Sequence, residues 1–107
     1  MIFHSFEDYQ RELFAATMFR CKVTEGVNVI NENDDAYSFF ILMKGNMHVF
    51  VGGKLMREIG PGASFGDIAL LYNSKRTATI TAVSHCELFG IGRDQYREMV
   101  MEIQNKE

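Results

Sequence analysis

Asp67 and Arg76 lie on either side of a short apolar run, within the stretch FGDIALLYNSKRTATI at residues 65–80. Gly66 precedes the run and gives the backbone freedom there. Residues 68–71 are too few for a long helix but fit one helical turn, whose unpaired N–H groups would face an anion. Arg76 would add the planar, charged fork that a phosphate prefers. These residue types indicate a phosphate-binding site.

Asp67 suggests a second contact, because a carboxylate repels a phosphate but accepts hydrogen bonds from hydroxyl groups. A ligand that carries both a phosphate and hydroxyl groups is a nucleotide or a sugar phosphate. The alternative is that Asp67 and Arg76 form a structural ion pair or stay solvated, which is common for charged side chains at a protein surface. The spacing alone leaves both interpretations open.

The elements that must position these residues are short and mostly extended. An amphipathic helix is predicted over residues 6–18, with Ser5 as its N-cap. Gly52-Gly53 is a hairpin turn, and a closing helix starts near Arg93. Alternating and buried apolar patterns predict strands at residues 19–23, 27–30, 38–43, 47–51, 54–59, 77–83 and 87–91. Short strands at this spacing predict a mainly β sandwich or barrel with flanking helices.

Size and charge exclude several classes. The 107 residues suit one domain with its own core, and a net charge of -3 without a run of Lys and Arg argues against a nucleic-acid partner. The longest apolar runs, such as residues 39–43, are too short to span a membrane. Residues 1–6 lack the pattern of a signal peptide. Cys21 and Cys86 are therefore expected to be reduced thiols in a cytoplasmic protein.

Enzyme chemistry has little support in the sequence. His4, His48 and His85 are dispersed, so neither a metal site nor a cupin-like metalloenzyme is expected. No nucleophile and base stand in a recognisable pattern. The glycines of residues 60–66 are followed by no Lys-Ser/Thr pair and no long helix, which argues against a dinucleotide or P-loop site. We expect no catalytic residue, metal or cofactor.

The whole stretch F-G-D-I-A-L-L-Y-N-x-x-R-T-A-T resembles the phosphate-binding cassette of cyclic nucleotide-binding domains, F-G-E-[LI]-A-L-x-x-x-x-x-R-x-A-[TS]. It is most similar to the domains of cAMP-dependent protein kinase regulatory subunits and of cGMP-dependent protein kinase. The flanking motifs G-x-G-x-S-F-G at residues 60–66 and L-F-G-I-x-R-D-x-Y at residues 88–96 extend the resemblance. Residues 29–34 resemble the family's second strand and acidic turn.

The resemblance implies one domain over residues 1–107, an eight-stranded jelly-roll β-barrel with N-terminal and C-terminal helices and a short cassette helix. Its ligand-binding residues would be Gly66, Asp67, Ile68, Ala69, Arg76, Thr77 and Ala78. By position, Arg76 would bind the exocyclic phosphate of a 3′,5′-cyclic nucleotide, helped by the N–H groups of Ala69 and Ala78. Asp34 would orient this arginine, and Leu70 would sense movement of the closing helix.

The sequence departs from the family pattern at the ribose-binding position and just before Arg93-Asp94. Asp67 replaces the family's glutamate and is one methylene shorter, beside Gly66, which would let the backbone approach the ribose. Gly92 stands where the kinase regulatory domains usually carry an acid. Thr77 matches a threonine that is frequent in cGMP-dependent kinases, whose hydroxyl can bond guanine. This favours cGMP slightly over cAMP.

The resemblance also implies the setting. The chain stops at Glu107, where family members continue into a lid helix, so we expect a binding module excised from a longer kinase-linked protein. Its partners would be a cyclic nucleotide and a kinase catalytic domain, in cis or in trans. The alternative is a degenerate domain with weak or no nucleotide binding that serves as an interaction module.

Overall fold

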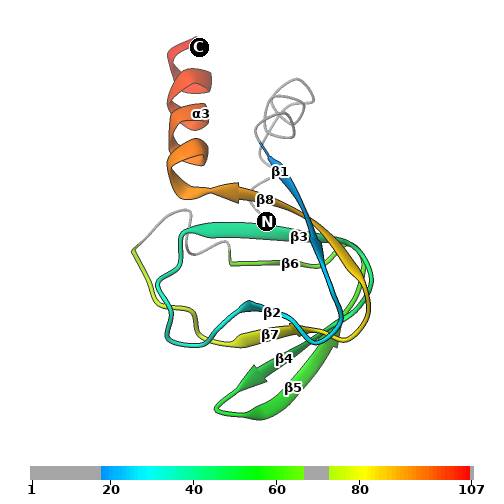
Figure 1. Ribbon diagram of the computed structural model, residues 1–107. Helices are drawn as coiled ribbons and strands as arrows, with labels where there is room; N and C mark the ends of the chain where they lie inside the picture. The colour runs from blue at the N-terminus through cyan, green and yellow to red at the C-terminus, as the bar shows by residue number, and fades with distance from the viewer. Residues whose placement is uncertain (1–17, 67–72, 107) are drawn as a thin grey trace.

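The computed structural model describes residues 18–66 and 73–106, which form eight strands and one helix (Figure 1). The strands are β1 (Phe19–Val23), β2 (Asn28–Ile30), β3 (Ser38–Lys44), β4 (Met47–Val51), β5 (Lys54–Ile59), β6 (Ser64–Phe65), β7 (Thr79–Ala82) and β8 (Cys86–Gly92). The helix is α3 (Arg93–Lys106). The expected N-terminal helix and cassette turn lie outside the described residues.

Two four-stranded antiparallel sheets face each other, with strand orders β1-β8-β3-β6 and β2-β7-β4-β5. This is the order of a jelly roll, in which strands far apart in sequence become neighbours. The mainly β, eight-stranded fold expected from the sequence is confirmed. Figure 1 shows the two sheets as upper and lower layers, with the hairpin of β4 and β5 at the bottom.

Apolar side chains fill the space between the sheets, because alternate residues of each strand point inward. The buried cluster comprises Val23, Ile30, Leu42, Met47, Val49, Phe65, Ile80, Ala82, Cys86 and Leu88. Cys86 and the half-buried Cys21 are free thiols, as predicted. The two sheets therefore share one core.

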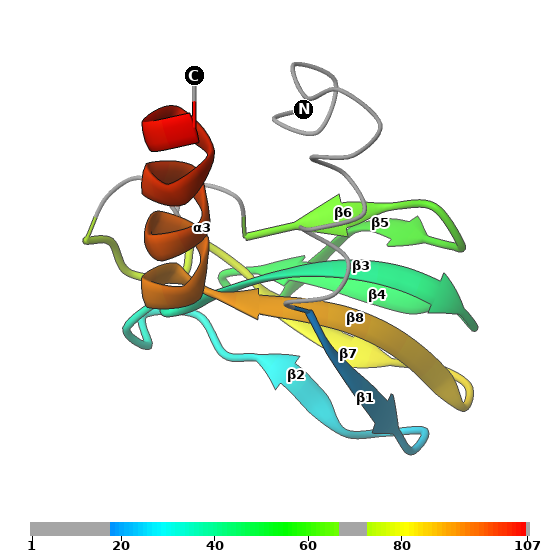
Figure 2. The ribbon, with the colours of Figure 1, turned by 90° about the horizontal axis from the view of Figure 1, so that it is seen from above.

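α3 starts directly where β8 ends. The Arg93 N–H donates to the carbonyl of Tyr37 (2.8 Å), and Asp94 places an acid in the first turn, where the helix dipole favours it. Figure 2 shows α3 standing at the end of the sandwich where β8 finishes, and in Figure 1 the helix projects above the upper sheet while the β4–β5 hairpin lies at the bottom. In the part of the chain that the structure describes, no helix is long and apolar enough to cross a membrane.

Several local expectations differ from the structure, and β2, β3 and β8 each differ from the expected bounds by one residue at one end or both. β6 was not expected, because a two-residue strand between glycines carries no alternation. β7 begins at Thr79 rather than residue 77, since its partner β4 pairs no further than Phe50. Phe19 on β1 is 45% exposed, and its ring lies over Gly90, where an added Cβ would come within 2.5 Å of it.

Candidate functional site

Two segments from different parts of the sequence form the framework of the site. Residues 33–38 run beside residues 73–76, and together we call them the site ribbon. Ala36 N donates to Ser74 O (3.0 Å), Arg76 N to Asp34 O (2.7 Å), and Asn33 N to Arg76 O (2.8 Å). The Asn33 φ of 73° lets the chain turn into this pairing. These bonds fix the main chain of Arg76.

The guanidinium of Arg76 packs against Gly66. Gly66 has a φ of +85°, and a Cβ added there would lie 2.6 Å from Arg76 Nη1 and 2.9 Å from the Ser38 carbonyl oxygen. Arg76 Nη2 donates to that same oxygen at 2.8 Å. Gly66 is therefore required for two reasons, its left-handed backbone and the space that the arginine occupies.

Arg76 is half-buried, and this burial lowers the pKa of its guanidinium below the ordinary arginine value. Arginine nevertheless stays charged in proteins at neutral pH. Within the described residues, Asp34 contacts Arg76 through its main chain, and no ion pair joins the Asp34 carboxylate to the guanidinium. The site thus holds a half-buried positive charge anchored by a carbonyl oxygen, a suitable partner for an anion.

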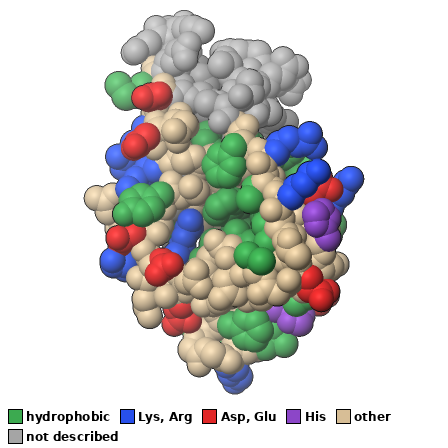
Figure 3. Space-filling model, viewed as in Figure 1, with side chains coloured by type: hydrophobic (Ala, Val, Ile, Leu, Met, Phe, Trp, Pro, Cys, Tyr) green, Lys and Arg blue, Asp and Glu red, His purple; other side chains and the backbone are tan. Residues whose placement is uncertain are grey.

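A cavity of about 280 Å³ opens beside this arginine, between the two sheets. Its lining comprises Ile30, Ala36, Val49, Arg57, Ser64, Phe65, Gly66, Ser74, Lys75, Arg76, Thr77, Ala78 and Ile80. Figure 3 looks toward the hollow between the sheets, where hydrophobic side chains gather. The cavity combines an apolar interior with a few polar groups, as small-molecule sites do.

The structure brings four of the expected ligand-binding residues to this cavity: Gly66, Arg76, Thr77 and Ala78. The other expected residues, Asp67, Ile68, Ala69 and Leu70, lie outside the described residues. Sequence reasoning missed Arg57, an exposed residue of β5 that reaches the cavity because β5 pairs with β4 at Val49. The signal in the sequence that could have identified Arg57 is a single arginine within a strand of the predicted hairpin.

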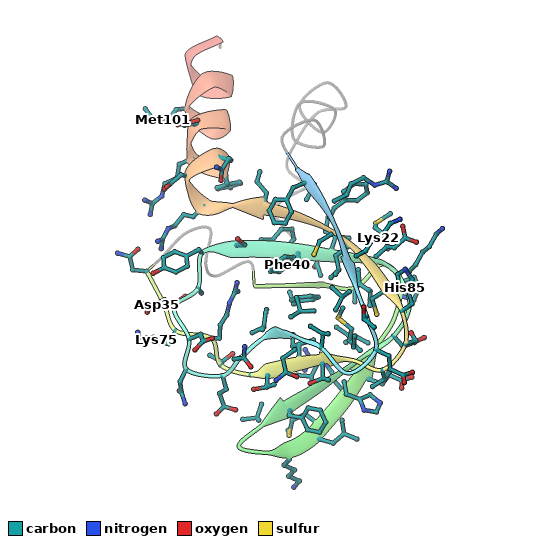
Figure 4. All side chains as sticks on the ribbon, viewed as in Figure 1. Lys22, Asp35, Phe40, Lys75, His85 and Met101 are labelled. Carbon is teal, nitrogen blue, oxygen red and sulfur yellow. The ribbon has the colours of Figure 1, made fainter. Side chains whose placement is uncertain are left out.

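Lys75 and Asp35 form an ion pair across the site ribbon, and Figure 4 shows them together at one end of the molecule. The hydrogen bond from Lys75 lowers the pKa of Asp35 below its ordinary value, and the same bond raises the pKa of Lys75. Tyr37 Oη also donates to Asp35 (3.3 Å). Both charged side chains are exposed, so their role is to hold the ribbon in register rather than to add much stability.

No three His, Cys, Asp or Glu side chains gather in a metal-binding arrangement anywhere in residues 18–66 and 73–106. The polar side chains that line the cavity are those of Arg57, Arg76, Lys75, Ser64, Ser74 and Thr77.

Solved structures of known proteins share this architecture. A cyclic nucleotide-binding-like protein from Brucella abortus superposes with a TM-score of 0.88 at 27% identity, over 94% of this chain and 90% of that one. The regulatory domain of Toxoplasma gondii PKA, solved with cAMP, gives 0.83 at 31% identity, over 98% of this chain and 42% of that one. The catabolite activator protein of Thermus thermophilus shares the fold, with a TM-score of 0.84 at 23% identity over 96% of this chain and 51% of that one.

The family model described as the cyclic nucleotide-binding domain matches residues 20–102. This match covers both sheets, the site ribbon and most of α3. The chain belongs to the family of cyclic nucleotide-binding domains.

Proposed function

We propose that this chain is a regulatory module that binds a 3′,5′-cyclic nucleotide in the cavity between its sheets, with the phosphate against Arg76. The observation that carries this proposal is the half-buried arginine packed on Gly66 and anchored to the Ser38 carbonyl oxygen. A monoanionic phosphate matches one fixed guanidinium fork. The cavity of about 280 Å³ is just smaller than the roughly 300 Å³ at which the range for small-molecule sites begins.

The remaining ligand contacts are proposed from the family motif. The N–H groups of Ala69 and Ala78 would hold the phosphate, and Asp67 would accept a hydrogen bond from the ribose. Gly66 and Ile68 are the other ligand-binding residues of the motif, and Asp34 and Leu70 would support the site. Asp67 is shorter than the family's glutamate, and losing a charged hydrogen bond would weaken binding by roughly 1.5–3 kcal/mol, about ten- to a hundredfold.

For the base, we propose a modest preference for guanine over adenine. Thr77 and Arg57 both line the cavity. The threonine hydroxyl can accept a bond from the 2-amino group of guanine, and an arginine can bind the paired O6 and N7 acceptors of guanine. Adenine lacks the 2-amino group and O6, so cGMP would gain more from these side chains than cAMP.

The deciding experiment is calorimetric titration of the chain with cGMP, cAMP and 5′-GMP. We expect both cyclic nucleotides to bind, cGMP somewhat more tightly, and Arg76→Lys to remove binding, because lysine lacks the planar fork. Arg20→Lys is the matched control, since Arg20 lies on β1 over the Phe89 ring. Equal binding by the Arg76→Lys and Arg20→Lys variants would contradict the proposal.

Thr77→Ala separates the base preference from binding itself. We expect this variant to weaken cGMP binding by about tenfold, the value of one hydrogen bond, while cAMP binding is unchanged. A parallel loss for both nucleotides would mean that Thr77 supports the phosphate site and not base selection.

For the output, we propose that nucleotide binding controls a protein kinase catalytic domain in the cytoplasm. Support comes from the cassette motif and from the similarity to the regulatory domain of Toxoplasma gondii PKA. The test is whether kinase activity purifies with the protein from its own cells and changes when cGMP is added. Nucleotide binding with no associated kinase would contradict this part of the proposal.

The alternative function is an interaction module that keeps the fold without useful nucleotide affinity, and Asp67 in place of glutamate is the feature that favours it. Thermal unfolding with millimolar cGMP or cAMP distinguishes the two functions, because a ligand that binds only the folded state raises the unfolding temperature. Asp67→Glu should increase the shift if the shorter carboxylate fails to reach the ribose. No shift for either protein would support the interaction module.

A further inference from the structure

α3 begins at a residue that contacts both segments of the site ribbon. Arg93 is the first residue of α3, and its N–H donates to the Tyr37 carbonyl at 2.8 Å. Its guanidinium lies over the Tyr37 ring, 5.7 Å from the centroid, and Nη1 donates to the side-chain oxygen of Asn73. One side chain therefore joins residues 33–38 to residues 73–76 at the base of the helix.

A second path joins the same helix to the anion site. Ser38 pairs with Gly92, the last residue of β8 before α3, and its carbonyl oxygen accepts the bond from Arg76. The segment from Asn73 to Arg76 is thus connected to the base of α3 at both ends. Between these ends, the Asp35–Lys75 ion pair holds the two segments together, with the Tyr37 hydroxyl bonded to Asp35.

We propose that Arg93 is a positioning residue for nucleotide binding: it holds the segment that carries Arg76 in the binding geometry and ties this geometry to the position of α3. This inference rests on the proposed function, since it concerns the same site. Arg93 is placed in none of the ligand contacts proposed above. It acts through Asn73 and Tyr37, which order Arg76 before the ligand arrives and so lower the entropy lost on binding.

Arginine suits this position better than lysine. The contact requires a flat cation that can lie on an aromatic ring and donate in its own plane to an amide oxygen at the same time. Lysine at this position could donate to Asn73 or approach Tyr37, but its single ammonium group lacks the flat face. Because the coupling between two sites is reciprocal, a ligand that prefers the ordered ribbon must also favour the α3 position that Arg93 contacts.

The test compares Arg93→Ala with Arg97→Ala in the whole chain. Arg97 is exposed on the same helix, one turn further on. Arg97→Ala therefore changes the net charge and the helix composition by the same amount as Arg93→Ala. The first measurement is amide hydrogen exchange in the ligand-free protein at the three N–H groups that bond between the two segments of the site ribbon, those of Asn33, Ala36 and Arg76. We expect Arg93→Ala to speed exchange there about tenfold, with little change in β8, and Arg97→Ala to have no effect.

The second measurement is cGMP affinity by calorimetry. We expect Arg93→Ala to weaken binding by about fivefold or more, and Arg93→Lys to restore only part of it. Asn73→Ala should also weaken binding, and the double variant should be no worse than Arg93→Ala alone, because both changes remove the Arg93–Asn73 contact. Additive losses would assign the two residues independent roles and overturn the proposal.

The outcomes separate this inference from the proposed function. If the amide exchange rates at Asn33, Ala36 and Arg76 are the same in the Arg93→Ala and Arg97→Ala variants, Arg93 does not position the ribbon. This holds whatever the nucleotide affinity of the two variants is. If wild-type protein binds neither cyclic nucleotide, the proposed function fails, while the exchange measurement still decides whether Arg93 orders the ribbon. If Arg93→Ala does not fold, Arg93→Lys and Asn73→Ala are measured in the same two assays.

Discussion

At the scale of single residues, Gly66 links backbone conformation to ligand chemistry. Its φ of +85° is in the left-handed region, and the position of a missing Cβ is occupied by the Arg76 guanidinium. We predict that Gly66→Ala loses stability by about 1–2 kcal/mol from the left-handed backbone alone. It should also lose nucleotide binding, because the new methyl group displaces Arg76 from the Ser38 carbonyl.

Gly26→Ala is the matched control, because Gly26 has nearly the same φ, +88°, but no atom within 4 Å of the added Cβ. Urea unfolding and cGMP titration of both variants check the prediction. Similar losses of stability with binding lost only in Gly66→Ala would confirm that contact with Arg76 matters. Binding that survives in both variants would show that the arginine adapts.

The sequence could identify some site residues and not others for a physical reason. Arg76 and Thr77 belong to a local motif, in which the residue types and their spacing are themselves the signal. The Ser38 contact is made by a carbonyl group, which every residue possesses, so no pattern marks it. Arg57 and Arg93 reach the site through sheet register and helix placement, which only the folded chain defines.

At the scale of elements, the strands with regular patterns were predicted most accurately. β4 and β5 have the expected bounds because Gly52 and Gly53, both at positive φ, fix their turn. The ends of β7 could not be predicted in this way, because its partners decide where pairing stops. Thr77 has a high β propensity and Ala78 is small, but neither residue pairs with β4. Both line the cavity instead.

Thr79 and Thr81 on β7 allow an element-scale prediction. Thr79 Oγ1 accepts a bond from Glu32 N (3.0 Å) in a half-buried setting, whereas Thr81 Oγ1 donates to Asn28 Oδ1 (2.7 Å) at the surface. We predict that Thr79→Val destabilises the protein by about 1–3 kcal/mol, because the N–H of Glu32 is left without its acceptor. Thr81→Val, the same change on the same strand, should cost less than about 0.5 kcal/mol.

Chemical denaturation of the two threonine variants measures this difference. Because Glu32 lies just before the site ribbon, Thr79→Val should also speed amide exchange at Asn33, and Thr81→Val should not. Equal stability of the two variants would mean that water replaces the missing acceptor at Glu32.

At the scale of the whole molecule, the jelly roll brings together segments that are distant in sequence. Residues 33–38 and 73–76 meet only because the chain passes through both sheets between them, and β8 then delivers α3 beside that meeting point. Motif and period in the sequence were sufficient to predict the fold class, and the motif also named Gly66 and Arg76, which line one cavity. The link from this site to the helix depends on contacts across the completed fold, which local patterns do not encode.

Ligand-dependent hydrogen exchange tests that link over the entire molecule. Amides of β3 and β8 flank buried side chains such as Phe39, Leu42 and Leu88, so they should exchange only by global unfolding. Nucleotide at a hundred times its Kd adds about 2.7 kcal/mol to the unfolding free energy and should slow these amides roughly a hundredfold. α3 projects from the sheets (Figure 1), so its amides should exchange by local opening instead. They should slow on binding only if the ligand favours one helix position, as the Arg93 contacts require. If nucleotide slows exchange in β3 and β8 but leaves exchange in α3 unchanged, this chain binds nucleotide without any effect of binding on the helix.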